Sequence, residues 1–451
     1  MAGAPSDMPK RKLGLFMAVA LVVGNMIGSG VFLLPASLGP MGWNSLYGWL
    51  VTIAGSLCLA VVLMRLACGR AATCAAFSYP ASAFGEGVGF VVAWSYWISC
   101  WVTNATLAVA AVSNLSIIWP WLAQPGIPAA ASLGLLWLLT LINCMGVRTA
   151  GGVQVVTMIL KLVPLAGVVL VALWLLADGS AAIAPHDSVP IGIGAIGVAA
   201  TFTLFAMLGF ESAMAAGDRV ENPERNVPRA TLIGVLIAGL IYLFACSAVT
   251  LMLPAAALEA SNAPFALFFS TLVDPALGPL VAVFVAVSAL GALNGFVLLQ
   301  AEMPLALARD GLLPAWVAKL NRNEIPHRIH LISTGLATLV VLSNYARGMA
   351  DLFQFMLLVT TSVTIIFYLA CAAAALRLAW QGKLAVSAGF LAVTAAASLY
   401  SAWAFYGAGI EASLWSLAMT ALGVPLYLVM RRSLSRAGRR PISAAATRDS
   451  A

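Results

Sequence analysis

The sequence predicts an all-α polytopic membrane protein with twelve transmembrane helices, and three observations support this fold class. Of the 451 residues, 62% are hydrophobic and only 9% are charged, whereas an average soluble domain is about a quarter charged. Apolar runs that can cross a bilayer, which takes about 20 helical residues, recur along the whole chain. Lysine and arginine gather on one side of these runs. Together these features exclude an ordinary soluble globule, a disordered chain and a secreted disulfide scaffold.

Apolar runs mark the predicted spans in chain order. They cover residues 13–36, 43–66, 84–118, 131–147, 153–177, 192–217, 230–254, 277–305, 331–347, 352–377, 385–407 and 412–430. The segments between them are too short to form a soluble domain. The first run follows a basic cluster but is long and lacks a small-residue cleavage pattern, so we expect a first span and not a removed signal peptide.

The basic residues predict the orientation of these spans. If the N-terminus is cytoplasmic, all of the 23 lysines and arginines except Arg347 and Lys161 fall on the cytoplasmic side. The positive-inside rule therefore places tails 1–12 and 431–451 in the cytoplasm, with the protein in the inner cell membrane. The net charge of +7 reflects this topology, and we expect no nucleic acid as a partner.

Two spans carry interruptions that a plain membrane helix does not need. Span 1 contains Gly24-Asn25-Met26-Ile27-Gly28-Ser29-Gly30, and span 6 contains Phe205-Ala206-Met207-Leu208-Gly209-Phe210-Glu211-Ser212. The two spans run in opposite directions because they lie an odd number of spans apart. Breaks in corresponding spans of inverted halves indicate a transporter's site near the midplane. The alternative is that these glycines only allow close helix packing.

The broken spans predict a receptor for both charged ends of an amino acid. An unwound turn at Gly28, Ser29 and Gly30 would free backbone N–H groups, which together with the helix dipole bind a carboxylate. Unwound backbone between Phe205 and Leu208 would present carbonyl groups to an ammonium group.

Two ionisable residues lie well inside apolar spans. Glu211 is placed centrally in span 6, where a charge is so costly that a functional role is the default hypothesis. It could carry a coupling proton, or it could be a neutral acid that only bonds freed backbone. Lys161 in span 5 could replace a bound sodium ion, or its side chain could extend to the cytoplasmic interface.

Span 3 places Ser99, Cys100, Thr103 and Asn104 on one helical face, because residues three or four apart share a face. Such a face could line a polar site, although Asn104 could equally serve as a hydrogen-bonding link between helices. The histidines are His186, His327 and His330, and all three fall in polar segments. We therefore expect no buried histidine, no metal site and no cofactor.

Several motifs resemble the amino acid–polyamine–organocation (APC) superfamily, most closely its arginine/agmatine antiporter branch. They are G-N-M-I-G-S-G-V-F-L-L-P at 24–35, S-Y-W-I-S-C-W-V-T-N at 95–104, G-F-E-S-A at 209–213 and E-N-P-E-R-N-V-P-R-A-T at 221–231. The resemblance implies a LeuT-like fold with inverted five-helix repeats at 13–177 and 192–377 and two extra helices within 385–430. It also implies alternating access without sodium.

The resemblance further implies the residues of the site. Substrate binding is assigned to Ile27, Ser29, Gly30, Tyr96, Ser99, Cys100, Asn104, Phe205, Leu208, Phe296 and Thr360. Gating or coupling is assigned to Lys161, Glu211 and Tyr368, with Tyr96 also at the gate.

The sequence departs from the antiporter branch in three respects. Phe205 and Phe296 stand where that branch has tryptophan, which weakens a cation–π contact to guanidinium because tryptophan is the best partner. Lys161 stands where the branch is apolar, although other superfamily members have lysine there. The loop at Cys74-Ala75-Ala76-Phe77 lacks the usual glycine pair.

The leading functional hypothesis is a sodium-independent antiporter that exchanges a cationic, arginine-like amino acid for its decarboxylated amine or another amino acid. Two alternatives stay open: a proton-coupled symporter of neutral amino acids, and a substrate-sensing receptor with the same fold. An intramembrane enzyme is not expected, because no nucleophile–base pair or ligand cluster lies at depth. The protein could form a homodimer.

Overall fold

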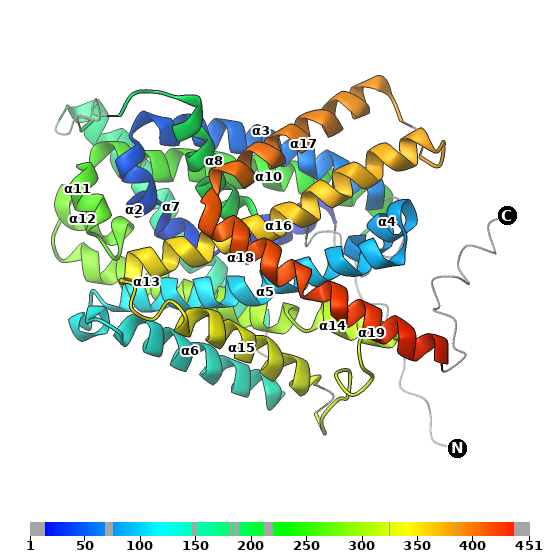
Figure 1. Ribbon diagram of the computed structural model, residues 1–451. Helices are drawn as coiled ribbons and strands as arrows, with labels where there is room; N and C mark the ends of the chain where they lie inside the picture. Colours follow the sequence, from blue (N-terminus) through cyan, green and yellow to red (C-terminus); the bar gives the residue numbers. More distant parts are fainter. Residues whose placement is uncertain are drawn as a thin grey trace, which may run out of the picture.

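The computed structural model describes residues 14–67, 75–146, 151–179, 183–184, 189–211, 220–323, 325–384 and 386–436. Within these ranges every regular element is a helix, which confirms the all-α fold class (Figure 1). Most of the two predicted tails, the loop residue Cys74 and His186 lie outside the described residues.

The first half of the chain supplies spans 1 to 5. Its elements are α1 (Leu15–Met26), η1 (Ser29–Phe32), α2 (Leu34–Leu38), η2 (Gly39–Met41), α3 (Trp43–Ala67), α4 (Ala75–Phe84), α5 (Glu86–Leu115), η4 (Pro120–Ala123), α6 (Ile127–Cys144) and α7 (Gly151–Asp178). Span 1 is built from α1, η1 and α2, and spans 2 to 5 are α3, α5, α6 and α7.

The second half supplies spans 6 to 12. Its elements are α8 (Ile193–Met207), α10 (Pro223–Met252), α11 (Ala255–Glu259), α12 (Pro264–Leu272), α13 (Leu277–Leu299), α14 (Glu302–Arg309), α15 (His327–Leu342), α16 (Met349–Trp380), α17 (Ala388–Gly407), α18 (Gly409–Ala421) and α19 (Gly423–Arg436). Spans 6 to 11 are α8, α10, α13, α15, α16 and α17, and α18 with α19 forms span 12.

The length of the helices supports twelve crossings. In the described part of the chain, nine helical segments are long and apolar enough to cross a membrane. Three shorter apolar helices, Leu15–Met26, Ile193–Met207 and His327–Leu342, coincide with predicted spans 1, 6 and 9. Two of these three are the spans in which the sequence predicted a break.

The breaks in spans 1 and 6 have local backbone causes. Helix α1 ends at Met26, and Gly28 is extended, with φ −90° and ψ 174°, before η1 begins. Helix α8 ends at Met207, and Gly209 has a φ of 104°, a left-handed value that favours glycine. A Cβ on Gly209 would stand 3.3 Å from the backbone oxygen of Asn25, so the two breaks lie against each other.

Helix contacts repeat in a symmetric way along the chain. The contact of α3 with α8 is matched by that of α10 with α1, and the contact of α5 with α16 by that of α13 with α7. The contacts of α5 with α15 and of α3 with α16 are likewise matched by those of α13 with α6 and of α10 with α7. In each match, every span of the first half is replaced by the span five positions later, and every span of the second half by the span five positions earlier. We propose from this pattern that 13–177 and 192–377 are the two inverted repeats.

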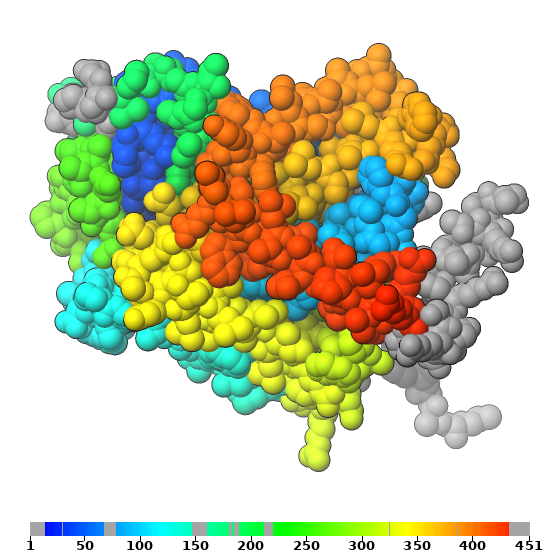
Figure 2. All heavy atoms as spheres, viewed as in Figure 1, coloured from blue at the N-terminus to red at the C-terminus, as the bar shows by residue number. Residues whose placement is uncertain are grey.

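The site is organised around α5, which lies at the centre of the bundle. Its most apolar window is 94% buried, whereas those of α17 and of α18 with α19 are 28% buried. Figure 2 shows α17 to α19, in orange and red, on the outside of the molecule beside the blue atoms of α4. These last helices expose large apolar side chains such as Leu399, Ile410 and Leu414, as helices that face lipid do.

Candidate functional site

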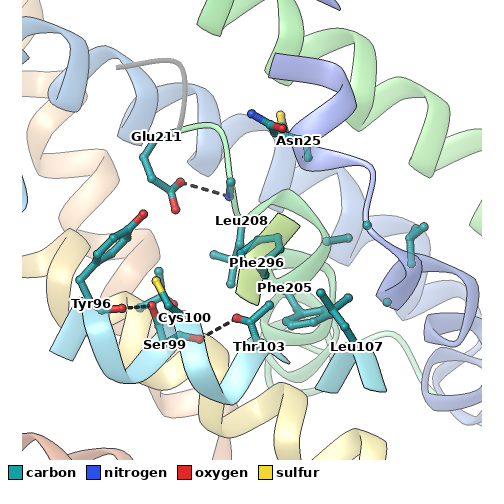
Figure 3. A pocket seen from close by; sticks show the side chains of 17 residues that line it. Asn25, Tyr96, Ser99, Cys100, Thr103, Leu107, Phe205, Leu208, Glu211 and Phe296 are labelled. Atoms are coloured by element: carbon teal, nitrogen blue, oxygen red, sulfur yellow. Dashed lines mark hydrogen bonds between the residues drawn. The ribbon is translucent and has the colours of Figure 1, made fainter. Parts of the chain in front are cut away.

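A cavity lies where the breaks in spans 1 and 6 face α5 (Figure 3). The space between its lining atoms, its opening to solvent included, is about 570 Å³. Helices α13 and α16 each add a side chain to its wall. The lining residues are Asn25, Met26, Gly28, Gly30, Val31, Tyr96, Ser99, Cys100, Thr103, Leu107, Phe205, Ala206, Leu208, Gly209, Glu211, Phe296 and Thr364.

One wall of the cavity is the start of η1. The first N–H groups of a helix have no partner within that helix, and no side chain caps those of η1. Gly28 and Gly30 line the cavity on either side of Ser29, so backbone donors are close to the cavity at this wall. The wall can therefore bind an anionic group such as a carboxylate.

The facing wall is the end of α8. The last carbonyl groups of a helix lack intrahelical partners, and here the N–H group of Leu208 bonds only the carbonyl of Phe205, over 3.2 Å. The ring of Phe205 lies against Gly30, so a methyl group on Gly30 would overlap it. The wall thus combines carbonyl acceptors with an aromatic ring next to the anion-binding turn.

The third wall is the polar face of α5, together with Thr364 of α16. The hydroxyl of Ser99 donates to the carbonyl of Tyr96 over 2.7 Å, and that of Thr103 donates to the carbonyl of Ser99 over 2.7 Å (Figure 3). The hydroxyl of Thr364 donates to the carbonyl of Thr360 over 2.8 Å. Because these three hydroxyl protons are already used within their helices, the oxygens offer the cavity only acceptor lone pairs.

Glu211 lines the cavity and is held by hydrogen bonds to two neighbours. Oε2 of Glu211 accepts hydrogen bonds from the hydroxyl of Tyr368 and from the N–H group of Gly209, each over 3.1 Å. The ring of Tyr368 stacks on Phe210, with centroids 5.6 Å apart. The acid therefore links the broken end of span 6 to α16.

Residues 13–430 match the amino acid permease family. The chain belongs to this family. The putrescine transporter PotE of Haemophilus influenzae is 32% identical over 427 residues, which are 92% of this chain and 96% of that protein. The cadaverine/lysine antiporter of Escherichia coli is 32% identical over 349 residues, 76% of this chain and 78% of that protein. The putrescine transporter PotE of Escherichia coli is 30% identical over 435 residues, 94% and 97% of the two chains.

The sequence motifs predicted that the protein is a member of the APC superfamily, which includes polyamine and amino acid antiporters. These similarities confirm that prediction. They also confirm that this permease is a multi-pass membrane protein of the transporter class. Its substrates are accordingly small amines or amino acids.

Seven of the predicted site residues line the cavity of this permease from α5, α8, α13 and η1. They are Gly30, Tyr96, Ser99, Cys100, Phe205, Leu208 and Phe296. The predicted gate residue Glu211 also lines it, and Tyr368 reaches it through the hydrogen bond to Glu211. Ser29 begins η1 between the lining residues Gly28 and Gly30 and is not itself part of the lining.

Four predicted residues besides Ser29 and Tyr368 lie outside the cavity lining. Asn104 is fully buried and donates through Nδ2 to Oε1 of Gln300 over 2.8 Å, which agrees with its alternative role as a link between helices. The hydroxyl of Thr360 donates to the carbonyl of Met356 within α16. Ile27 is buried in the break of span 1, and Lys161 is 3% exposed on α7.

Several lining residues were absent from the predicted site. Thr364 occupies the cavity wall one turn beyond Thr360, so the register of α16 differs from the expected one by a turn. Leu107 lies two turns beyond Cys100 on the same face of α5, a spacing that could have found it. Val31 and Ala206 are small apolar neighbours of the breaks, and no polar signal marks them.

The expectation of no buried histidine was wrong. His330 belongs to α15, is 2% exposed, and its Nδ1 lies 3.4 Å from Nε2 of Gln300. Helix α15 begins at His327, earlier than the predicted span, and one turn later His330 faces inward. Within the described residues, His330 has no set of His, Cys, Asp or Glu side chains around it that could hold a metal ion.

Proposed function

We propose that the protein is a sodium-independent antiporter that exchanges a cationic amino acid for its decarboxylated amine by alternating access. The observation that carries this proposal is the cavity itself, which lies at the meeting point of two oppositely directed broken helices. Such breaks form the substrate sites of transporters built from inverted repeats. The similarity to a cadaverine/lysine antiporter and to putrescine transporters supports the choice of substrate class.

The α-amino-acid end of the substrate lies between the two breaks in this proposal. Backbone N–H groups of Ser29 and Gly30 bind the carboxylate, and carbonyl groups of Ile27, Phe205 and Leu208 accept from the α-ammonium group. This assignment uses backbone groups at helix ends, which every amino acid can engage, so it sets no preference among side chains. A diamine would place one ammonium group at the same carbonyls.

The distal end of the substrate lies along α5 and carries a primary ammonium group. Ser99, Thr103 and Thr364 supply acceptors and no free hydroxyl proton, which suits an ammonium group because it is a donor only. Phe296 covers the aliphatic part of the chain. Phenylalanine at positions 205 and 296 favours lysine-like substrates and diamines over arginine, since it is a weaker cation–π partner than tryptophan.

Glu211, Tyr368 and Tyr96 form the gate at the distal end, and Lys161 with Glu211 couples the cycle to protons. The burial of Lys161 supports a role as a fixed cation in place of sodium. The same observation favours the second candidate function, which is proton-coupled symport of neutral amino acids. In both cases the termini are cytoplasmic, the membrane is the inner membrane, and the protein is not an enzyme. A homodimer stays a prediction.

Counterflow in proteoliposomes distinguishes these functions. Vesicles loaded with lysine should accumulate labelled lysine or diamine, and external diamine should release internal lysine without sodium. Accumulation of neutral amino acids driven only by a proton gradient would instead establish the symporter. Binding without flux would indicate a receptor.

A further inference from the structure

A chain of buried polar side chains lies directly behind the cavity and connects α5, the end of α13 and α15. Nδ2 of Asn104 donates to Oε1 of Gln300 over 2.8 Å, and Nε2 of Gln300 lies 3.4 Å from Nδ1 of His330. Asn104, Gln300 and His330 are 0%, 1% and 2% exposed. Leaving a polar group unpaired at such depth is costly, so the contacts through Nδ2 of Asn104 and the amide of Gln300 hold the three side chains together. Within the described residues, Oδ1 of Asn104 has no hydrogen-bond partner.

This network sits one helical turn from two residues that line the cavity. Asn104 follows Cys100 by four positions on α5, and Gln300 follows Phe296 by four positions on α13. Residues four apart in a helix are neighbours on one face. In addition, the N–H group of Gln300 bonds the carbonyl of Phe296 over 3.0 Å, so the turn carrying Phe296 is continuous with Gln300. The Asn104–Gln300 hydrogen bond therefore joins α5 and α13 one helical turn after Cys100 and Phe296.

A second polar bond keeps α15 in register with α5. Nε1 of Trp97 donates to the hydroxyl oxygen of Ser333 over 3.0 Å, and both residues are buried. His330 lies one turn before Ser333, so Gln300 meets a histidine whose helix is already fixed to α5. Gln300 is the central member of the network, because it alone contacts both other helices.

We propose that Gln300 is a positioning residue that sets the length of substrate the cavity accepts. It does so by holding the Cys100 turn of α5 against the Phe296 turn of α13, which fixes the depth of the distal half of the cavity. The inference rests on the proposed function, since it concerns amines that extend from the broken helices toward this wall. Gln300 acts through Cys100 and Phe296 and does not itself contact the substrate.

The test measures binding of straight-chain diamines with three to six carbons to the purified full-length protein, together with their counterflow. Gln300→Met keeps the volume of the side chain and removes both polar contacts. Gln300→Glu keeps the acceptor oxygen for Asn104. Asn143→Leu is the matched control, because Nδ2 of Asn143 donates to Oδ1 of Asn294 over 2.7 Å and joins α6 to α13 away from the cavity lining.

In Gln300→Met, the ratio of the affinities for the best diamine and for the diamine one carbon longer should change by about tenfold. This is the factor by which one methylene group changes affinity in a pocket that fits its ligand closely. Gln300→Glu should keep the wild-type length profile, and Asn143→Leu should affect all lengths by the same factor. If Gln300→Met does not fold, Asn104→Leu breaks the same bond from α5 and must change the profile in the same way.

An unchanged length profile in the variants that break the Asn104–Gln300 bond overturns the inference, and so does an equal loss for all diamines as in the control. A wild type that binds and exchanges no amine overturns the proposed function, and this inference with it. The two failures are distinguished by the wild-type measurement alone.

Discussion

The ring of Phe205 occupies the space that any side chain on Gly30 would need, because a Cβ built on Gly30 would overlap Cε1 of that ring. Phe205 also packs edge-on against Phe353, with centroids 6.3 Å apart, which limits how far the ring can move aside. Gly30 is therefore required by the close approach of the two broken spans. The same contact places the aromatic ring beside the backbone donors of η1.

Replacing Gly30 should abolish substrate binding while expression is largely retained. Gly30→Ala forces Phe205 away from η1, and Gly30→Leu also fills the cavity beside the donors. Isothermal titration with lysine and diamines should show no saturable binding for either variant. The double variant Gly30→Ala with Phe205→Leu should recover part of the affinity, because the smaller side chain makes room for the methyl group. Wild-type affinity in Gly30→Leu would remove this turn from the site.

Phe205→Trp should change the selectivity of the cavity toward guanidinium. Tryptophan is the strongest cation–π partner among the aromatic side chains, and such contacts contribute about 0.5–2 kcal/mol. Arginine and agmatine should therefore gain up to that amount relative to lysine and diamines in competition against labelled substrate. Phe353→Leu serves as a control, since it loosens the packing around Phe205 without adding a cation–π partner. Equal gains for all substrates would contradict the role of this ring in selectivity.

The two breaks and the polar face of α5 could be predicted because their signals are local. Glycines and a polar or acidic residue inside an apolar run predict an interrupted helix around Gly30 and around Glu211. A spacing of three or four residues predicts that Ser99, Cys100 and Thr103 share one helical face. The partner of Asn104 could not be predicted in this way. Gln300 lies 196 residues after Asn104 in the sequence. A pattern within single spans cannot show which helices contact each other.

His330 and Thr364 illustrate the same limit for helix ends and registers. The sequence around His330 is polar and predicts that the span begins at residue 331, whereas α15 starts at His327 and His330 is buried. In α16 the hydroxyls of Thr360 and Thr364 both bond their own helix, and only the packing of α16 on α5 decides that Thr364 lines the cavity.

Asp310, which directly follows α14, should make stability depend on pH. Burial, and then repulsion from Glu86, raise the pKa of Asp310 above its ordinary value of 3.8. The folded state thus holds this proton more tightly than the unfolded state, so stability falls as the pH rises above that value. Asp310→Asn, which resembles the protonated form, should raise the unfolding temperature at neutral pH and lose this advantage below about pH 4.

Thermal unfolding in detergent between about pH 3.5 and 7.5 checks the Asp310 prediction, because this window covers the ordinary carboxyl range and the raised one. Glu86→Gln should reduce the advantage of Asp310→Asn, because it removes the repulsion that contributes to the shift. An advantage that is the same at both ends of the pH range would mean that Asp310→Asn acts through packing and not through charge.

Lys161→Ala should impair the transport cycle more than substrate affinity. Lys161 is buried on α7 and does not line the cavity, so its loss removes a fixed cation without removing a substrate contact. Exchange in proteoliposomes should slow by at least about tenfold, a change in barrier of about 1.4 kcal/mol, while the Kd for lysine stays close to that of the wild type. A strict sodium requirement in the wild type would contradict the idea that Lys161 replaces an ion.

Glu211→Gln should flatten the pH dependence of exchange while the substrate still binds. In the wild type, the hydroxyl of Tyr368 donates to Glu211 over 3.1 Å. The glutamine side chain has nearly the same shape and can still accept this hydrogen bond, but it cannot bind or release a proton. Tyr368→Phe is the matched control. It removes one hydrogen bond to the acid, worth about 1.5–3 kcal/mol when the acceptor is charged, and leaves the carboxyl group able to titrate. This variant should therefore shift the pH profile along the pH axis and should not flatten it.

Exchange of lysine against a diamine, measured in proteoliposomes between about pH 5 and 8, separates these outcomes, because a carboxyl group in a membrane site can titrate over such a range. Binding must be measured in parallel at each pH, so that a loss of flux is not mistaken for a loss of affinity. A wild-type pH profile in Glu211→Gln would show that the acid only bonds the N–H group of Gly209 and the hydroxyl of Tyr368. Coupling would then have to depend on another group, and Lys161 is the other ionisable residue that the sequence places well inside an apolar span.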